Sequence, residues 1–305
     1  MTAAIQSPRI SRYEHVVFRQ RPGKRRRINF APTQNSKDSF NAPVTASLLD
    51  PCDAAFLRWL FAQAGLELRS YRQETLHRRL AACLRSLHVN NVAEARKLLL
   101  RQPDKIAVAT DALVIGVTSL FRDVDVFDYL LQSVLPALPQ APYRRRIWSV
   151  GSSDGDEIYS VAILLAELGL LDHTELLATD CRSAAIANIR KATYRLADLQ
   201  NIPLEWRERY FTPDGGDWRV VRELRQAVQT RLADVTRIGE PGAWDMILCR
   251  NMAMYLRPDV ATDLWARFEE AIRPGGFLIL GKAERPQGCT RLSMVAPCIY
   301  RRDRG

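Results

Sequence analysis

The sequence predicts an α/β protein with a largely parallel, doubly wound sheet, because short apolar strands alternate with amphipathic helices over residues 145–300. The clearest unit begins at Arg145, where an apolar run of strand length leads into a loop that contains Gly151 and Gly155. A helix follows, and its apolar residues share one face at helical spacing: Ile158, Val161, Ala162, Leu165 and Leu168. A strand, a glycine loop and a helix in this order are typical of a nucleotide-binding unit.

A second signal lies at the end of the next expected strand, 175–180, which finishes in Asp180. In such sheets an acid at this place hydrogen-bonds a ribose hydroxyl group. The glycine loop is not G-x-G-x-x-G and lacks the Lys-Ser/Thr of a P-loop, which argues against a dinucleotide or a nucleoside triphosphate. The loop and the acid together favour an adenosine-type ligand.

The other expected elements complete this alternation. The strands are expected over 228–233, 244–249, 277–280 and 294–300, and the helices over 127–135, 184–192 and 259–272. The last helix is expected to end at Pro274-Gly275-Gly276. A turn at 213–217 predicts a small β-hairpin within an insertion at about 203–225.

Residues 51–116 predict a small helical domain. Asp53 is expected to cap a helix that runs to Ala64 and stops at Gly65. Three more helices are expected from apolar stripes at Leu76, Leu80, Cys83, Leu84 and Leu87, at Val92, Ala95, Leu98 and Leu99, and over 106–115. The second helix also carries four arginines, Arg72, Arg78, Arg79 and Arg85. Its basic face either binds an acidic partner or is solvated.

The net charge of +10 comes entirely from the first 115 residues. Residues 1–50 hold nine basic and three acidic side chains, and residues 51–115 hold ten and six, whereas residues 116–305 balance at 25 of each. We interpret residues 1–50, which contain prolines and the cluster Lys24-Arg25-Arg26-Arg27, as a basic disordered tail. The excess charge in the helical domain would attract an acidic partner.

Several classes of protein are disfavoured by composition. No apolar run reaches the length of a membrane span and no signal peptide is evident, so a cytoplasmic location without membrane insertion is expected. The six cysteines form no C-x-x-C pair and only four histidines occur, so we expect neither a metal site nor a disulfide framework. Nucleic acid is a poor candidate for a substrate, because the basic tail reads no sequence and no motif for a base pocket is present.

Five motifs resemble those of the CheR chemotaxis methyltransferases, which use S-adenosylmethionine to esterify glutamate side chains of chemoreceptors. The motifs are Val117–Asp123, Trp148–Ser160, Ala178–Asp180, Cys249–Tyr255 and Pro274–Glu284. The resemblance covers about residues 53–302. It implies a Rossmann-like methyltransferase domain over 117–302 after an all-helical domain, with S-adenosylmethionine as the cofactor. It further implies that the helical domain holds a glutamate-bearing helix and that the hairpin docks on receptors.

The resemblance also implies the residues of the site. Cofactor contacts fall on Thr118, Arg122, Asp156 or Glu157, Asp180, Asp234, Val235, Arg250 and Asn251, and the glycine loop adds Gly151. Arg122 is expected to pair with a carboxylate of cofactor or substrate, and Tyr255 to border the transferring methyl group. We expect these two to be the catalytic residues. A carboxylate acceptor is already anionic, so alignment and exclusion of water, rather than a general base, are expected to drive catalysis.

The sequence departs from the family pattern at several positions. The main loop has Asp154, Asp156 and Ile158 where the family has Thr, Glu and Pro. Arg182 replaces a second acid after Asp180, and Gly116 stands where some members have Asn. The chain is therefore interpreted as a divergent member. Its acceptor is expected to be a glutamate of a chemoreceptor-like protein. The alternatives are a small acid or a carrier-bound acyl chain, and, in another class, a catalytically inactive binding module.

Overall fold

The computed structural model describes residues 50–304 apart from 115, 117, 140–141 and 201. The basic tail predicted for residues 1–50 therefore lies outside the described residues, with the exception of Asp50. Asp50 caps the first helix, because its side chain accepts a hydrogen bond from the backbone N–H of Cys52 at 2.8 Å. Among the described residues, no helix is long and apolar enough to cross a membrane.

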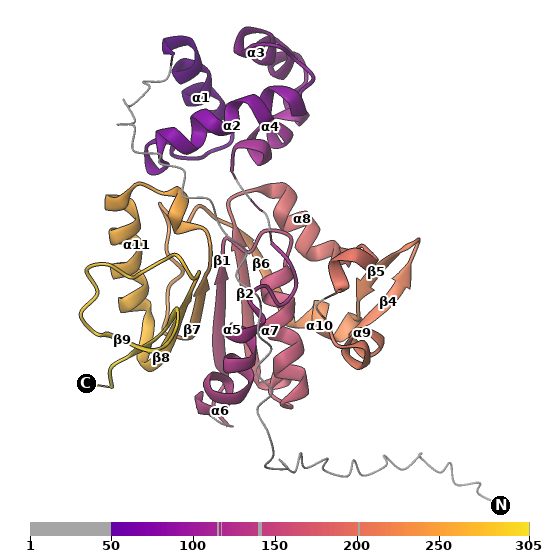
Figure 1. Cartoon of the computed structure of the whole chain (residues 1–305), viewed down its shortest axis with the longest axis vertical. Helices are drawn as coiled ribbons and strands as arrows, with labels where there is room; N and C mark the ends of the chain where they lie inside the picture. Colours follow the sequence, from indigo (N-terminus) through magenta and orange to yellow (C-terminus); the bar gives the residue numbers. More distant parts are fainter. Residues whose placement is uncertain (1–49, 115, 117, 140–141, 201, 305) are drawn as a thin grey trace, which may run out of the picture. The chain divides into compact units, whose positions relative to one another are not determined.

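Four helices form the first part of the described chain (Figure 1). They are α1 (Pro51–Gln63), α2 (Gln73–Ser86), α3 (Val92–Arg101) and α4 (Ile106–Leu113). The prediction that Asp53 caps α1 is wrong: proline is well suited to the first helical position, so the helix starts at Pro51 and Asp50 becomes the cap. The fourth helix ends two residues earlier than predicted, and Ile115 lies outside the described residues.

The predicted doubly wound sheet is confirmed. It has seven strands in the order β6-β2-β1-β7-β8-β10-β9. The strands are β1 (Arg145–Val150), β2 (Thr174–Asp180), β6 (Val228–Leu232), β7 (Trp244–Cys249), β8 (Ile272–Leu280), β9 (Leu292–Ala296) and β10 (Ile299–Arg302). The first five in spatial order are parallel, and β10 and β9 are antiparallel to their neighbours.

Helices cover both faces of this sheet. On β1, Trp148 packs edge to face on Phe268 of α11 (Pro258–Ala271), with ring centroids 5.5 Å apart. The next residue, Ser149, donates a hydrogen bond to Glu157 of α7 (Asp156–Glu167) at 2.8 Å. Because successive side chains of a strand point to opposite faces, α7 and α11 lie on opposite sides of β1. This double cover explains why β1, β2 and β7 are buried along almost their whole length.

Some predicted boundaries are corrected by the structure. The strand predicted over 294–300 is two antiparallel strands, β9 and β10, which pair with each other. The helix predicted to 272 ends at Ala271, and Pro274-Gly275-Gly276 lies inside β8, where the pairing with β7 shifts register. A Cβ on Gly276 would lie 2.8 Å from the carbonyl oxygen of Asp245, so close backbone approach requires glycine there.

Two further regions position the site. The amphipathic segment predicted around 127–135 is α5 (Val124–Tyr129), a π-helical turn (Leu130–Val134) and α6 (Leu135–Ala137). The helix predicted over 184–192 is α8 (Ser183–Lys191).

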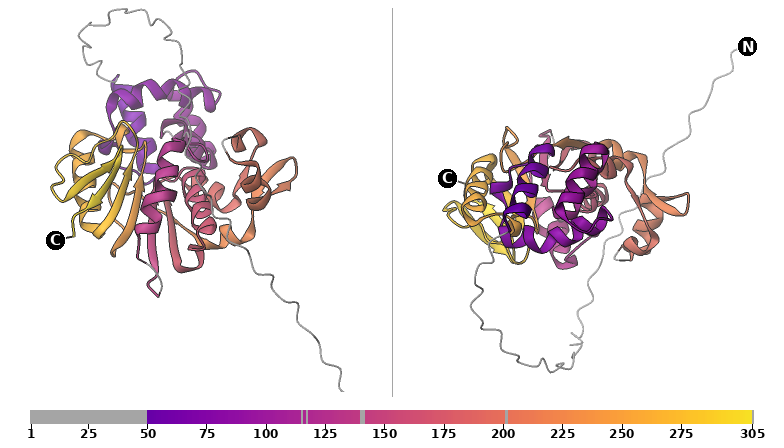
Figure 2. Two further views of the ribbon diagram at one scale, coloured as in Figure 1. Left: turned by 60° about the horizontal axis from the view of Figure 1, so that its bottom comes forward. Right: turned by 90° about the horizontal axis from the view of Figure 1, so that it is seen from above.

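The predicted hairpin is confirmed as β4 (Phe211–Asp214) and β5 (Asp217–Val220), which form a separate three-stranded sheet with β3 (Thr193–Tyr194). Helices α9 (Leu204–Tyr210) and α10 (Arg222–Ala227) flank the hairpin in the chain. Figure 2 shows this insertion, in orange, beside the main sheet.

Candidate active site

A pocket lies at the carboxyl ends of β1, β2 and β7, where doubly wound sheets bind their ligands. Its free volume is about 80 Å³. The predicted site residues that line it are Thr118, Arg122, Gly151, Glu157, Asp180, Asp234, Val235, Arg250, Asn251 and Tyr255. The fold therefore brings together residues that are scattered over most of the sequence, and Asp156 is the predicted site residue outside this lining.

The loop between β1 and α7 is held in one conformation. Gly151 has a φ of +63°, and a Cβ at this position would lie 3.0 Å from the Met252 side chain. The backbone N–H of Ser152 donates to the carbonyl of Thr179 at 3.0 Å, which joins the ends of β1 and β2. Gly155, with a φ of +93°, precedes the first residue of α7. The two glycines thus permit a turn that other residues adopt only with strain.

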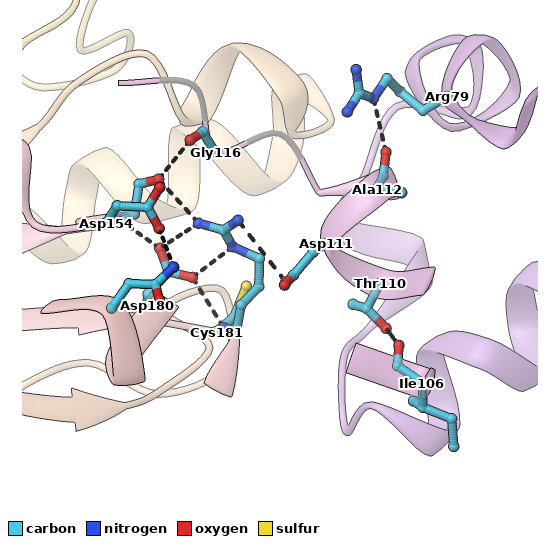
Figure 3. Close-up of polar contacts among 12 residues, drawn as sticks. Arg79, Ile106, Thr110, Asp111, Ala112, Gly116, Asp154, Asp180 and Cys181 are labelled. Atoms are coloured by element: carbon cyan, nitrogen blue, oxygen red, sulfur yellow. Dashed lines mark hydrogen bonds and ion pairs between the residues drawn. The ribbon is translucent and has the colours of Figure 1, made fainter. Parts of the chain in front are cut away.

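Asp180 is buried at the end of β2, as the strand-end argument predicts, but its oxygens already have partners. One oxygen accepts from the backbone N–H of Arg182 and from its Nε, both at 3.0 Å. The other accepts from the backbone N–H of Ser153 at 2.9 Å and from Nη2 of Arg182 at 3.4 Å. Figure 3 shows this cluster. The sequence indicated that Arg182 was unusual, but not that it would bind Asp180.

Two other acceptors in the pocket have no hydrogen-bond partner within the described part of the chain. They are Oδ2 of Asp234 and Oδ1 of Asn251, and both are buried. The other oxygen of Asp234 accepts from the backbone and the hydroxyl group of Thr236, which fixes the carboxylate. Buried polar groups are nearly always paired, so these two oxygens suit a ligand that brings hydrogen-bond donors. S-Adenosylmethionine supplies such donors through its amino groups and ribose hydroxyl groups.

Arg250 has a structural role beside the pocket. Its side chain is 3% exposed and its Nη2 lies 2.7 Å from the Asp123 carboxylate and 2.7 Å from the carbonyl oxygen of Arg122. Its Nη1 lies 3.6 Å from Glu157, whose pKa is raised by burial and lowered by this arginine. Arg250 thereby holds the loop that carries Thr118 and Arg122 against α7.

Glu157, rather than Asp156, is the acid that faces the pocket. Consecutive residues on a helix do not face the same way, so only one of the two can point into it. Asp156 is buried on the other side of the helix start, in a polar cavity that Thr118, Asp154 and Asp198 also line. Burial, together with the nearby carboxylates, raises the pKa of Asp156 to about 7.

This raised pKa predicts a measurable effect on stability. The carboxyl binds its proton more tightly in the folded than in the unfolded chain, so the free energy of unfolding should fall as the pH rises from about 4 to about 7. Asp156→Asn should remove that dependence, and at pH 8 its free energy of unfolding in urea should exceed that of the wild type by up to about 4 kcal/mol. The difference should shrink towards pH 5. An unchanged difference across this range would contradict the assignment.

The helical region contacts the pocket through α2 and the turn before it. Tyr71 and Leu256 form an isolated β-bridge, and Nε of Arg72 donates to the carbonyl of Leu256 at 2.8 Å. Arg79 donates to the carbonyl of Ala112 on α4 at 3.0 Å (Figure 3). Two of the four arginines predicted to form a basic face therefore hold backbone carbonyls of other elements. Arg78 and Arg85 are exposed on α2.

The possible bases of the pocket lining are the carboxylates of Glu157, Asp180 and Asp234, and the lining offers no ionised cysteine thiol at neutral pH. Burial raises the pKa of the Cys181 thiol to about 12 and raises the pKa of the Tyr71 hydroxyl well above its usual value. The lining described for the pocket contains no histidine. In the described part of the chain, no group of His, Cys, Asp or Glu side chains is arranged to hold a metal ion.

Comparison with known proteins decides the family. The model of the CheR methyltransferase SAM-binding domain matches residues 116–298, and that of the CheR all-alpha domain matches residues 54–114. The chain belongs to the CheR methyltransferase family. As a CheR methyltransferase it depends on S-adenosylmethionine for methyl transfer, and the predicted enzyme class and cofactor are confirmed.

The curated relatives carry related names. The chain is 31% identical over 233 residues to chemotaxis protein methyltransferase 2 of Pseudomonas aeruginosa. This alignment covers 74% of this chain and 83% of the relative. It is 29% identical over 253 residues to chemotaxis protein methyltransferase 1 of Vibrio cholerae, and this alignment covers 80% of this chain and 92% of the relative. It is 28% identical over 266 residues to the chemotaxis protein methyltransferase of Salmonella typhimurium, and this alignment covers 81% of this chain and 90% of the relative. These three alignments cover between 74% and 81% of this chain.

Proposed function

We propose that this CheR methyltransferase transfers the methyl group of S-adenosylmethionine to a carboxylate, and that the acceptor is a glutamate side chain of a chemoreceptor-like protein. The observation that carries the proposal is a pocket whose carboxylates are held by hydrogen bonds and ion pairs and whose lining has neither a histidine nor an ionised thiol. Asp180, Asp234 and Asn251 converge on it, while the Cys181 thiol remains protonated at neutral pH. An acceptor that must lose a proton would find only these held carboxylates to take it. A glutamate needs no base, because it is ionised at pH 7.

The residues would act by binding and orientation. The unpartnered oxygens of Asp234 and Asn251 would accept hydrogen bonds from the cofactor, and Asp180 would accept them from its ribose hydroxyl groups. When bound, S-adenosylmethionine would supply an electrophilic methyl group, and the bond from the carboxylate oxygen to the methyl carbon would form as the carbon–sulfur bond breaks to leave a neutral thioether. Arg122 and Tyr255 line the same pocket and would orient the acceptor and border the transferring methyl group. No proton moves, so alignment and exclusion of water supply the rate enhancement.

The acceptor would approach from the helical region. Tyr71, Thr75 and Leu76 line the pocket beside the strand ends, so this region forms one of its walls. The exposed Arg78 and Arg85 of α2 suit an acidic helix. The names of the bacterial relatives, which are chemotaxis proteins, support a receptor as the acceptor.

A methyl-transfer assay tests this proposal. The purified protein is incubated with methyl-labelled S-adenosylmethionine and a cytoplasmic fragment of a chemoreceptor, and the product is treated with mild alkali. A glutamyl methyl ester should release labelled methanol, and a fragment whose acceptor glutamates are changed to glutamine should release none. Alkali-stable label would contradict carboxyl transfer. Label that enters small acids or an acylated carrier protein, but not the fragment, would favour the alternative acceptors.

A further inference from the structure

Two unusual residues of the sequence meet in the pocket. The guanidinium atoms of Arg182 lie 2.4 to 2.7 Å from the position that a Cβ on residue 116 would occupy. Any other residue at this position would therefore displace the guanidinium, so Gly116 makes room for Arg182. The hydroxyl group of Ser153 connects them further, since it accepts from Nη2 of Arg182 at 3.2 Å and donates to the carbonyl of Gly116 at 2.7 Å.

Arg182 supplies three of the four hydrogen bonds that Asp180 accepts. A carboxylate accepts about four hydrogen bonds, and Asp180 receives four. Two of the donors are backbone N–H groups, those of Ser153 and Arg182, which the ends of β1 and β2 hold in place. The other two donors belong to the guanidinium. The hydroxyl groups of a ribose can therefore reach Asp180 only where the guanidinium now lies.

A second carboxylate, that of Asp111, lies beside the guanidinium. Asp111 of α4 has an oxygen 4.0 Å from Nη1 of Arg182, and its side chain is 31% exposed. Figure 3 shows Asp111 directed at the cluster around Asp180. Burial raises the pKa of Asp111 and Arg182 lowers it, so a closer approach by the arginine would stabilise the ionised carboxylate.

We infer that Arg182 is a positioning residue that binds Asp180 in the free protein and moves to Asp111 when the ribose of S-adenosylmethionine binds Asp180. The inference rests on the proposed cofactor site. It makes cofactor affinity depend on the strength of an internal ion pair, because the ribose must compete with the guanidinium. It also connects cofactor binding to α4, which packs against α2, the helix with the exposed arginines. By linkage, whatever stabilises the Arg182–Asp111 pair would also favour the cofactor-bound state.

Titration calorimetry with S-adenosylhomocysteine tests the competition. Arg182→Ala removes the competing cation, so the ligand should bind about tenfold more tightly than to the wild type. Gly116→Ala keeps the arginine but fills the space of its guanidinium, and it should tighten binding in the same direction. This second variant guards against loss of folding in the first. Arg190→Ala, on the exposed side of α8, is the matched control and should leave the affinity unchanged. Weaker or unchanged binding by both test variants would overturn the inference.

A double-mutant cycle tests the receiving carboxylate. Asp111→Asn in the wild-type background should weaken binding about threefold, because the displaced guanidinium loses its partner. The same substitution in the Arg182→Ala background should have no effect. Equal effects in both backgrounds would overturn the role of Asp111. Failure of the proposed site itself would look different: Asp180→Asn would then bind the ligand as the wild type does.

Discussion

Asp180→Asn is expected to weaken binding of S-adenosylhomocysteine about 100-fold and to reduce methyl transfer in proportion. The carboxylate lies buried at the end of β2, and under the proposal it accepts from two ribose hydroxyl groups once the guanidinium of Arg182 has moved away. Each hydrogen bond to a charged group contributes about 1.5 to 3 kcal/mol, and an amide of the same size offers a neutral oxygen and an unwanted donor. Calorimetric titration of the two proteins measures the loss directly.

Asp154→Asn is the matched control for this experiment. Asp154 lies in the loop between β1 and α7, next to the end of β2, but it accepts a hydrogen bond from Asn188 of α8 at 2.9 Å and does not line the pocket. Its substitution removes the same charge from the same neighbourhood and should change the affinity less than twofold. A comparable loss in both variants would mean that overall charge, rather than a contact with Asp180, governs binding.

Arg250→Ala is expected to destabilise the protein by about 3 to 5 kcal/mol. The guanidinium is almost fully buried between Asp123 and Glu157, and its removal leaves the buried Glu157 without this cation and Asp123 with Lys282 alone. It also frees the loop before α5, where Phe121 and Asp123 both have a positive φ that the surrounding contacts maintain. Urea denaturation followed by far-UV circular dichroism measures the change in the free energy of unfolding.

An exposed ion pair provides the comparison. Arg257 and Asp259 lie 3.0 Å apart with side chains 52% and 61% exposed. Arg257→Ala should cost less than about 1 kcal/mol, because water solvates both charges when they separate. If the two arginine variants lost similar stability, the buried network around Arg250 would not have the structural role assigned to it.

The main features of the fold and of the pocket could be predicted because they depend on local pattern. The strand, glycine loop and helix around Gly151 are encoded by hydrophobic periodicity and by two positions that need a positive φ. The carboxyl ends of parallel strands meet at one edge, so Asp180 was expected at the edge that binds the ligand. The family motifs added Thr118, Asn251 and a choice between Asp156 and Glu157, which the pattern of apolar residues does not indicate.

Other features could not be predicted because they depend on which distant groups meet. The ion pair between Arg182 and Asp180 needs the empty space at Gly116, which is a property of the folded chain. Arg79 of α2 and Arg72, the residue before α2, were interpreted from the sequence as part of a solvated or partner-binding face. Both donate hydrogen bonds to backbone carbonyls that only the tertiary structure brings near. The charge composition of a segment predicts the net charge of its surface. It does not predict which arginines bind groups within the protein instead of facing solvent.

The structure of the protein in complex with S-adenosylhomocysteine tests the central claim most directly. The account predicts that the ligand lies at the carboxyl ends of β1, β2 and β7, with its ribose hydroxyl groups hydrogen-bonded to Asp180. It also predicts a donor of the ligand within hydrogen-bond distance of Asp234 or Asn251, and the Arg182 guanidinium beside Asp111. A ligand bound elsewhere, or a ribose that makes no contact with Asp180, would contradict it.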